Sequence, residues 1–184
     1  MATIYEEMHG LAPKIEIQKR KNILEKFAHN RGVSERESTK YFSMLWEAFA
    51  WAAIIGFYHN KKKPLKQPLS EETDAPFKYS TLYNNGSDIF YSLVLFAIAK
   101  EGYEVVSNVN RINQVIEEYA NGGFEVIHTI EKEKGLDYFG DEANFLQEIM
   151  ERQIKSTEEL EESIKEKAKE KKEVSTGEGF DLNF

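Results

Sequence analysis

Hydrophobic side chains recur at helical spacing close to the start of the chain. Residues 14–31 mix apolar and basic positions with a period near 3.6, which predicts an amphipathic helix. The apolar positions of this segment are Ile15, Ile23, Leu24 and Phe27. Gly32 follows and predicts the end of the helix, because glycine readily takes the positive φ found at helix C-termini.

Two later segments are apolar on nearly all sides, which predicts buried central helices. The first covers about 38–57, and the hydroxyl of Ser38 can cap it. The second covers about 87–100 and follows the turn signal Asn84-Asn85-Gly86. We expect residues 58–83 between them to form a loop, which at this length either has a function or carries a short extended segment.

A longer periodic pattern covers residues 107–131, with Ser107 as its expected N-cap. The pattern crosses Gly122-Gly123, and two glycines cost roughly 2 kcal/mol relative to alanines in a continuous helix. Either the helix breaks there, or a neighbouring group requires a bare backbone. A last helix is expected from Asp141 onward.

The pattern changes character near the C-terminus. Glu158 to Lys172 alternate acidic and basic residues, which is typical of a solvated helix with i,i+4 ion pairs. We therefore predict an all-α fold, a compact bundle of four to five helices over residues 10–155. A charged helical arm (156–174) and a flexible C-terminal tail (175–184) are expected to follow.

The net charge of −8 is unevenly distributed. Residues 141–184 carry thirteen acidic and seven basic side chains, whereas residues 1–140 carry nineteen and seventeen. A nearly neutral body with an acidic C-terminal part argues against a dedicated, strongly basic nucleic-acid binder. A local basic patch remains compatible with these numbers.

The composition also limits the expected cellular location and the chemistry that the side chains can perform. The sequence has no cysteine, which excludes thiolate chemistry and fits a reducing cytosol. Its most apolar run, residues 45–57, is shorter than the ~20 residues that a membrane helix needs. We expect a cytoplasmic protein with no membrane segment.

Catalytic chemistry has little support in the sequence. The four histidines stand alone, without the spacing of a helical metal-ligand pair. Glu117 and Glu118 are adjacent, so their side chains point about 100° apart on a helix and cannot flank one bond. We predict no catalytic residue, no metal site and no cofactor, which favours a binding protein over an enzyme.

Three blocks of the sequence resemble a known family in order and spacing. They are residues 41–65, 84–99 and 111–125, and the most specific piece is Glu117-Glu118-Tyr119-Ala120-Asn121-Gly122-Gly123. Together they resemble the Dnd (DNA phosphorothioation) system-associated protein 4 family. The N-terminal helix and the acidic C-terminal extension are departures from that family's pattern.

The resemblance implies a role but no mechanism. Such bacterial proteins look like accessory components of DNA-modification and phage-defence gene clusters. The family provides no catalytic residues to carry over.

The 117–123 segment is the first candidate site. In a functional interpretation it binds a partner protein, with backbone N–H groups exposed at the glycines and Asn121 as a hydrogen-bonding residue. In a structural interpretation the glycines end one helix and begin the next, and Tyr119 belongs to the core. The candidate partner-binding residues are Glu117, Glu118, Tyr119, Asn121, Gly122 and Gly123.

The C-terminal tail is the second candidate site for a partner protein. Phe180, Leu182 and Phe184 alternate with polar residues at the end of the charged arm. Aromatic residues on a flexible tether suit insertion into an apolar pocket of another protein. The alternative is a disordered tail whose aromatic residues have no role.

Two basic regions support an alternative function as a weak, sequence-independent DNA-binding module. One is the 59–66 loop, and the other is the 14–36 helix, with seven basic and three acidic residues. The favoured interpretation of both regions is a solvated surface without a binding role. The candidate nucleic-acid-binding residues of the loop are His59, Lys61, Lys62, Lys63 and Lys66.

These observations favour a non-catalytic adaptor, an accessory subunit of a DNA-modification or phage-defence system. Its expected partners are protein subunits of that system. The oligomeric state is left open by the sequence. Weak DNA contact is the alternative, and a strong salt dependence of DNA binding would favour it.

Overall fold

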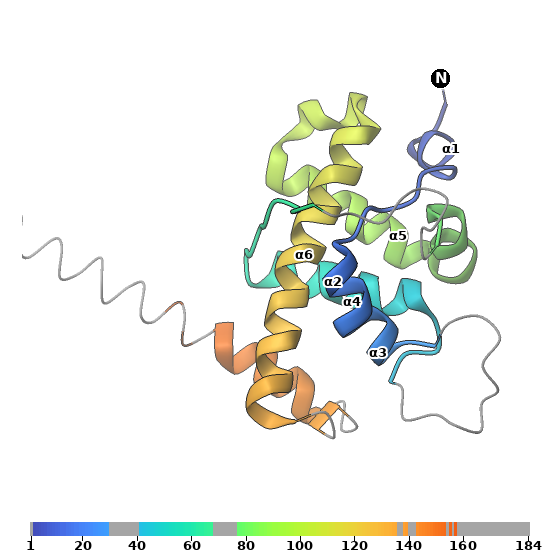
Figure 1. Ribbon diagram of the computed structural model, residues 1–184. Coiled ribbons are helices and arrows are strands. Elements are labelled where there is room, and N and C mark those ends of the chain that lie inside the picture. Colours follow the sequence, from blue (N-terminus) through green and yellow to red (C-terminus); the bar gives the residue numbers. More distant parts are fainter. Residues whose placement is uncertain are drawn as a thin grey trace, which may run out of the picture. The chain divides into compact units, whose positions relative to one another are not determined.

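The computed structural model describes residues 2–29, 41–67, 77–135, 138–139, 143–153, 155 and 157. These residues form helices joined by loops, with a single parallel bridge between Ala28 and Phe42 and no strand, so the all-helical prediction is confirmed (Figure 1). The chain divides into two compact units, residues 1–141 and 142–184.

Helix α6 (Val109–Lys134) runs through the first unit (Figure 1). Its N-cap is Asn108, whose side chain accepts a hydrogen bond from the backbone N–H of Arg111 at 3.1 Å. The prediction of Ser107 as the cap was wrong by one residue. The helix ends at Gly135, where φ is +86°. Glycine suits this position because residues with a side chain rarely adopt a positive φ.

Helix α4 (Leu45–Tyr58) lies against α6 and is buried along most of its length, as its apolar pattern predicts. The residue before it, Met44, is extended, and the Glu47 carboxylate accepts hydrogen bonds from the backbone N–H groups of Ser43 and Met44. The predicted start near Ser38 was too early, because residues 41–44 are not helical. The predicted helix end at Gly32 was too late, because Ala28 is already extended.

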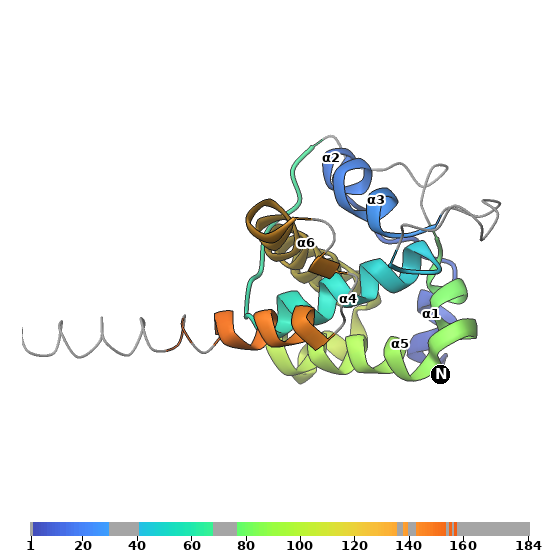
Figure 2. The same ribbon diagram turned by 90° about the horizontal axis from the view of Figure 1, so that it is seen from below.

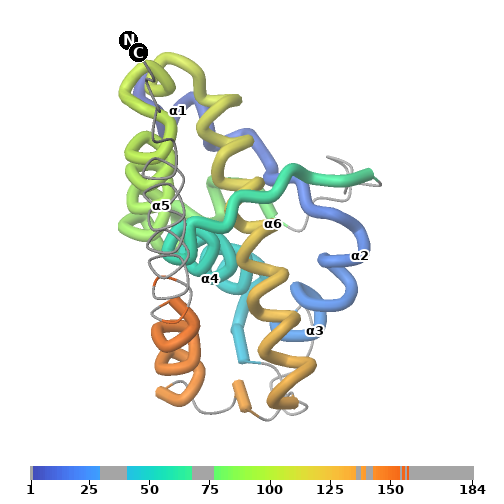
Figure 3. Tube along the Cα trace, turned by 90° about the vertical axis from the view of Figure 1, so that its left-hand side faces the viewer, coloured from blue at the N-terminus to red at the C-terminus, as the bar shows by residue number. Residues whose placement is uncertain are grey.

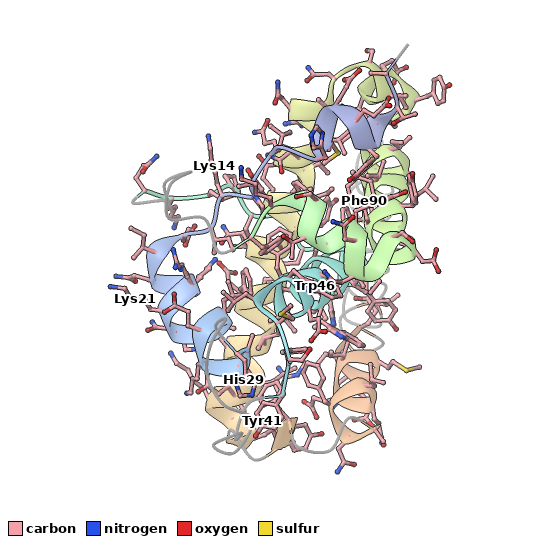
Figure 4. All side chains as sticks on the ribbon, turned by 90° about the vertical axis from the view of Figure 1, so that its right-hand side faces the viewer. Lys14, Lys21, His29, Tyr41, Trp46 and Phe90 are labelled. Atoms are coloured by element: carbon pink, nitrogen blue, oxygen red, sulfur yellow. The ribbon has the colours of Figure 1, made fainter. Side chains whose placement is uncertain are left out.

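Helix α5 (Tyr79–Glu101) begins about eight residues before its predicted start. The turn signal Asn84-Asn85-Gly86 marks a kink within it, because Gly86 has the non-helical angles φ −159° and ψ 65°. A Cβ at Gly86 would lie 3.3 Å from the indole ring of Trp46. Figure 4 shows Trp46 on α4 and Phe90 on the neighbouring α5. The kink therefore accommodates a large aromatic side chain from the adjacent helix.

The N-terminal region contains a short helix that the hydrophobic pattern does not predict. Helix α1 (Ile4–Met8) begins with a capping box, in which Thr3 and Glu6 each bind the other's backbone N–H. The predicted 14–31 helix is shorter in the structure. It consists of α2 (Ile17–Lys19), a π-helical turn η1 (Arg20–Leu24) and α3 (Glu25–Phe27) in direct succession.

Within the first unit, α4 and α6 form a middle layer. Helix α5 lies on one side of this layer, and the α2–α3 segment lies on the other (Figure 2). A 3-10 turn η4 (Tyr103–Ser107) connects α5 to α6. In the second unit, residues 143–153 are helical, and the predicted arm and tail lie largely outside the described residues. No helix among the described residues has the length and apolar character needed to cross a membrane.

Candidate functional site

The two glycines of the 117–123 segment lie where α4 and its following loop approach α6. A Cβ added to Gly123 would lie 1.7 Å from the carbonyl oxygen of Ala52, and one added to Gly122 would lie 1.7 Å from that of Lys61. On α4, a Cβ at Gly56 would lie 1.9 Å from the carbonyl oxygen of Tyr119. Such distances leave no room for any side chain.

Helix α6 passes through Gly122 and Gly123 without a break. Of the two alternatives for Gly122-Gly123, a helix break or a neighbouring group that requires a bare backbone, the structure shows the second. The helix-break interpretation was wrong, because the close crossing of α4 stabilises the glycines within the helix. The neighbouring Tyr119 is buried, and its ring stacks on Phe57 with centroids 4.2 Å apart.

Asn121 fixes the loop that follows α4. Its Nδ2 group donates to the backbone carbonyls of Lys63 and Pro64 at 3.2 and 3.0 Å, and to the Glu16 carboxylate at 3.0 Å. Its Oδ1 accepts from the Lys19 ammonium at 2.6 Å. These bonds hold the loop across α6, where Figure 3 shows it.

The two adjacent glutamates of the segment have different partners. Glu117 accepts from the backbone N–H of Lys14 at 2.7 Å and from the Asn113 amide at 2.9 Å, and burial raises its pKa. Glu118 accepts from the Gln114 amide at 2.9 Å and forms an ion pair with Lys62 at 3.3 Å. Both carboxylates are buried and bind groups of the chain itself. Partner binding by this segment stays a prediction.

Acidic side chains of α5 and α6 form ion pairs with three of the four lysines of the 59–66 loop. Lys61 and Lys63 both form ion pairs with Glu125, at 3.5 and 3.7 Å. Lys62 forms ion pairs with Glu101 and Glu118. Burial opposes the ionisation of Glu125, but the nearby lysines outweigh it and lower the pKa of this carboxyl group.

Several basic residues of the N-terminal segment are paired in the same way. Arg20 binds Glu25 at 2.7 Å, and Lys26 binds Glu131. Lys21, by contrast, is exposed and is labelled in Figure 4 on the outer side of this segment. The pairing lowers the positive potential of both basic regions, which weakens the basis for DNA binding.

The outer face of α5 is a surface that the sequence interpretation missed. Tyr91, Leu95 and Phe96 are 44%, 63% and 42% exposed, and we call these three residues the α5 face. Between Asp88 and Lys100 the sequence carries no charged residue. Most of this apolar segment was assigned to the core because all its sides looked alike. The lack of a single charge over three helical turns was the available signal.

Two more exposed aromatic residues lie at neighbouring helix ends. Tyr103, in η4 directly after α5, is 81% exposed, and Tyr58, at the end of α4, is 46% exposed. The ring of Phe57 contacts Phe96, which places the end of α4 beside the α5 face. The buried Phe57 thus supports one residue of the α5 face from below.

These features define a small all-helical protein in which the most distinctive polar residues bind the chain itself and an uncharged helix face is left exposed. The chain belongs to the family of DNA sulphur modification system-associated protein 4, whose model matches residues 30–167. This confirms the resemblance found in the sequence. A search of curated proteins and a search of solved structures found no match. Helices α1 to α3 lie outside the matched region.

Proposed function

We propose that this protein is a non-catalytic adaptor subunit of a DNA sulphur modification system and that it binds another protein subunit through the α5 face. The observation that carries the proposal is the exposure of Tyr91, Leu95 and Phe96 on a helix face without charge. Family membership supplies the system in which the partner is to be sought.

The physical argument rests on the hydrophobic effect. Covering apolar surface is favourable by about 25 cal/mol per Å². Aromatic residues grouped on an exposed surface are typical of protein–protein contacts. The α5 face lies on the helical part of α5 that follows the kink at Gly86, so it fits an apolar helix face of the partner, packed ridge into groove.

The finer parts of the proposal follow from the sequence. The resemblance suggests a phosphorothioation-linked, phage-defence role in the bacterial cytoplasm. Phe180, Leu182 and Phe184 of the tail are proposed as a second contact with partner proteins, and they lie outside the described residues. The α5 face is proposed as the primary contact because its exposure and its lack of charge are both observed.

Weak DNA binding is the less favoured function. Lys61, Lys62 and Lys63 have acidic partners at 3.7 Å or closer. A phosphate would have to compete with carboxylates that are already in place, which reduces the counterion release that drives DNA binding.

Affinity purification from the native host tests the proposal. The wild type is compared with Leu95→Lys, and both samples are treated with nuclease. We expect the wild type to retain subunits of the sulphur modification system, identified by mass spectrometry, and Leu95→Lys to lose them. Leu95 is 63% exposed, so the substitution leaves the core intact.

Two further variants complete the experiment. Asn110→Lys adds the same charge at an exposed position of α6 and should retain the subunits. Deletion of residues 175–184 tests the tail separately. If Leu95→Lys retains every subunit while the deletion loses them, the α5 face is not the docking surface and the tail is. Subunits that are retained by the wild type without nuclease and lost after nuclease treatment would contradict the adaptor function.

A further inference from the structure

A groove lies between the N-terminal helix α1 and the η4 turn. Its volume is about 610 Å³, within the range of small binding pockets. Ala2 and Ile4 form one side, and Tyr103 and Val106 contribute to the other. The walls are therefore largely apolar.

Two carboxylates give the groove a single sign of charge. Glu7 from α1 and Glu104 from η4 both line it, and both side chains are exposed. Among the residues that the structure describes, those that line the groove include no basic one. The combination selects a ligand with an apolar body and a positive charge.

The wall formed by α1 is held in place by contacts that leave Glu7 unused. The capping box of Thr3 and Glu6 fixes the start of the helix. Tyr5 stacks on Tyr83 of α5 with ring centroids 3.8 Å apart, and its ring also meets the edge of Phe90. The groove is thus a formed feature of the fold.

We propose that this groove binds an arginine or lysine side chain of the partner subunit, together with an apolar residue beside it. The aliphatic stem of the basic residue would lie along Ile4 and Val106, and its cationic group would lie between Glu7 and Glu104. The exposed ring of Tyr103 offers a face for cation–π contact. An arginine suits this environment better than a lysine, because its planar group can stack and pair at once.

The inference rests on the proposed function, because it assigns a chemistry to part of the same partner. The η4 turn begins at Tyr103, two residues after α5 ends. The groove is therefore within reach of a partner segment that covers the α5 face. Helix α1 lies outside the 30–167 region matched by the family model. One wall of the groove is therefore specific to the N-terminal segment of this chain.

Site-specific photocrosslinking in the native host tests the inference. Tyr103 is replaced by p-benzoyl-L-phenylalanine, and the crosslinked peptide is identified by mass spectrometry. We expect a segment of another subunit of the system with an arginine or lysine within about one helical turn of the crosslinked residue. A segment without a basic residue, a second copy of this chain, a small molecule only or no crosslink would overturn the inference.

Charge reversal tests the electrostatic part. Glu7→Lys and Glu104→Lys, each combined with the photocrosslinker, should lower the crosslink yield at least tenfold. Glu151→Lys makes the same charge change at an exposed position of the 143–153 helix and should leave the yield unchanged. Changing the mapped basic residue of the partner to glutamate should restore the yield with Glu104→Lys, which a merely structural effect would not do.

The outcomes separate the two proposals. If Leu95→Lys abolishes subunit retention while both charge reversals leave the crosslink yield intact, the groove inference fails and the adaptor function stands. If Leu95→Lys and the tail deletion both leave retention intact, neither the α5 face nor the tail is the docking surface. If the wild type itself retains no subunit, the adaptor function fails. Thermal unfolding followed by circular dichroism verifies that every variant is folded.

Discussion

The α4–α6 crossing and the α5 face differ most clearly in packing: the first is tightly packed, and the second is exposed. At the crossing, Gly56 and Gly123 let two helix backbones approach until no side chain fits between them. On the α5 face, Leu95 is 63% exposed in the middle of an uncharged helix surface. The segment that looks most distinctive in the sequence lies in the first region, and an exposed apolar surface lies in the second.

The difference shows that a distinctive sequence segment can serve the fold itself. Glu117 and Asn121 are buried, and each accepts or donates hydrogen bonds within the chain. Such a network stabilises one arrangement, because an unpaired buried polar group is costly. The α5 face has the reverse property, since its apolar residues gain from a partner that the chain does not supply.

The largest effect is expected for Gly123→Ala. The new methyl group would overlap the carbonyl oxygen of Ala52, so the helices must separate. We expect the free energy of unfolding to fall by about 3 kcal/mol or more, measured by urea denaturation. The gain of about 1 kcal/mol from replacing glycine in a helix does not offset this.

Gly10→Ala is the matched control for the crossing. A Cβ at Gly10 meets nothing within 4 Å. Its free energy of unfolding should stay within about 0.5 kcal/mol of the wild type. Equal effects at Gly10 and Gly123 would contradict the close crossing of α4 and α6.

The second-largest effect is expected for Asn121→Ala. The substitution leaves the carbonyls of Lys63 and Pro64 and the Lys19 ammonium without this partner. We expect a loss of about 2 kcal/mol in urea denaturation. Asn110→Ala removes the same amide at an exposed position in the first turn of the same helix, so a similar loss there would show that the network contributes nothing.

Glu117 and Glu101 should contribute to the pH dependence of stability with opposite signs. Burial raises the pKa of Glu117 above its ordinary value of 4.5, so the folded state binds this proton more tightly than the unfolded chain. The wild type therefore loses stability from Glu117 as the pH rises through that window. The stability of Glu117→Gln relative to the wild type should rise with pH.

Glu101 gives the opposite sign. Hydrogen bonds from Lys62 and Arg111 lower the pKa of this carboxyl group below 4.5. Its contribution is present above pH 4.5 and is lost as the pH falls through the folded pKa. Glu101→Gln should therefore destabilise at neutral pH and approach the wild type in acid. Parallel pH profiles of the two variants, measured by urea denaturation, would contradict these assignments.

The smallest effect on stability is expected for Leu95→Lys. An exposed residue contributes little to the core, so the free energy of unfolding should stay within about 0.5 kcal/mol of the wild type. The same variant should lose partner binding. A residue of the α5 face would then affect binding without affecting stability, the reverse of a glycine at the α4–α6 crossing. A loss above about 1 kcal/mol would show that another part of the chain covers the α5 face in solution.

Hydrophobic periodicity predicted most of the helices but few of their ends. The pattern at 107–131 corresponds to α6, and the apolar runs correspond to α4 and α5. The short helix α1 was missed, because one turn and a capping box give a weak periodic signal. The early start of α5 was missed because a helix passes through Asn84-Asn85-Gly86 when Trp46 packs against the kink.

The sequence alone could not predict which polar residues bind one another. Lys19 meets Asn121, and Lys14 meets Glu117, across more than a hundred residues of chain. Local charge counts therefore described the 59–66 loop and the 14–36 segment as basic surfaces, although acids elsewhere in the chain neutralise much of that charge. Only the three-dimensional arrangement reveals these partners.

Asn121 recognises the loop after α4 by two carbonyl oxygens and not by any of its side chains. A backbone carbonyl is present whatever the residue type, so this anchor does not depend on which side chains the loop displays. Substitutions there can exchange lysine for arginine or for an apolar residue while the anchor persists. The loop is therefore a place where members of one family can diversify their surface chemistry without changing their architecture.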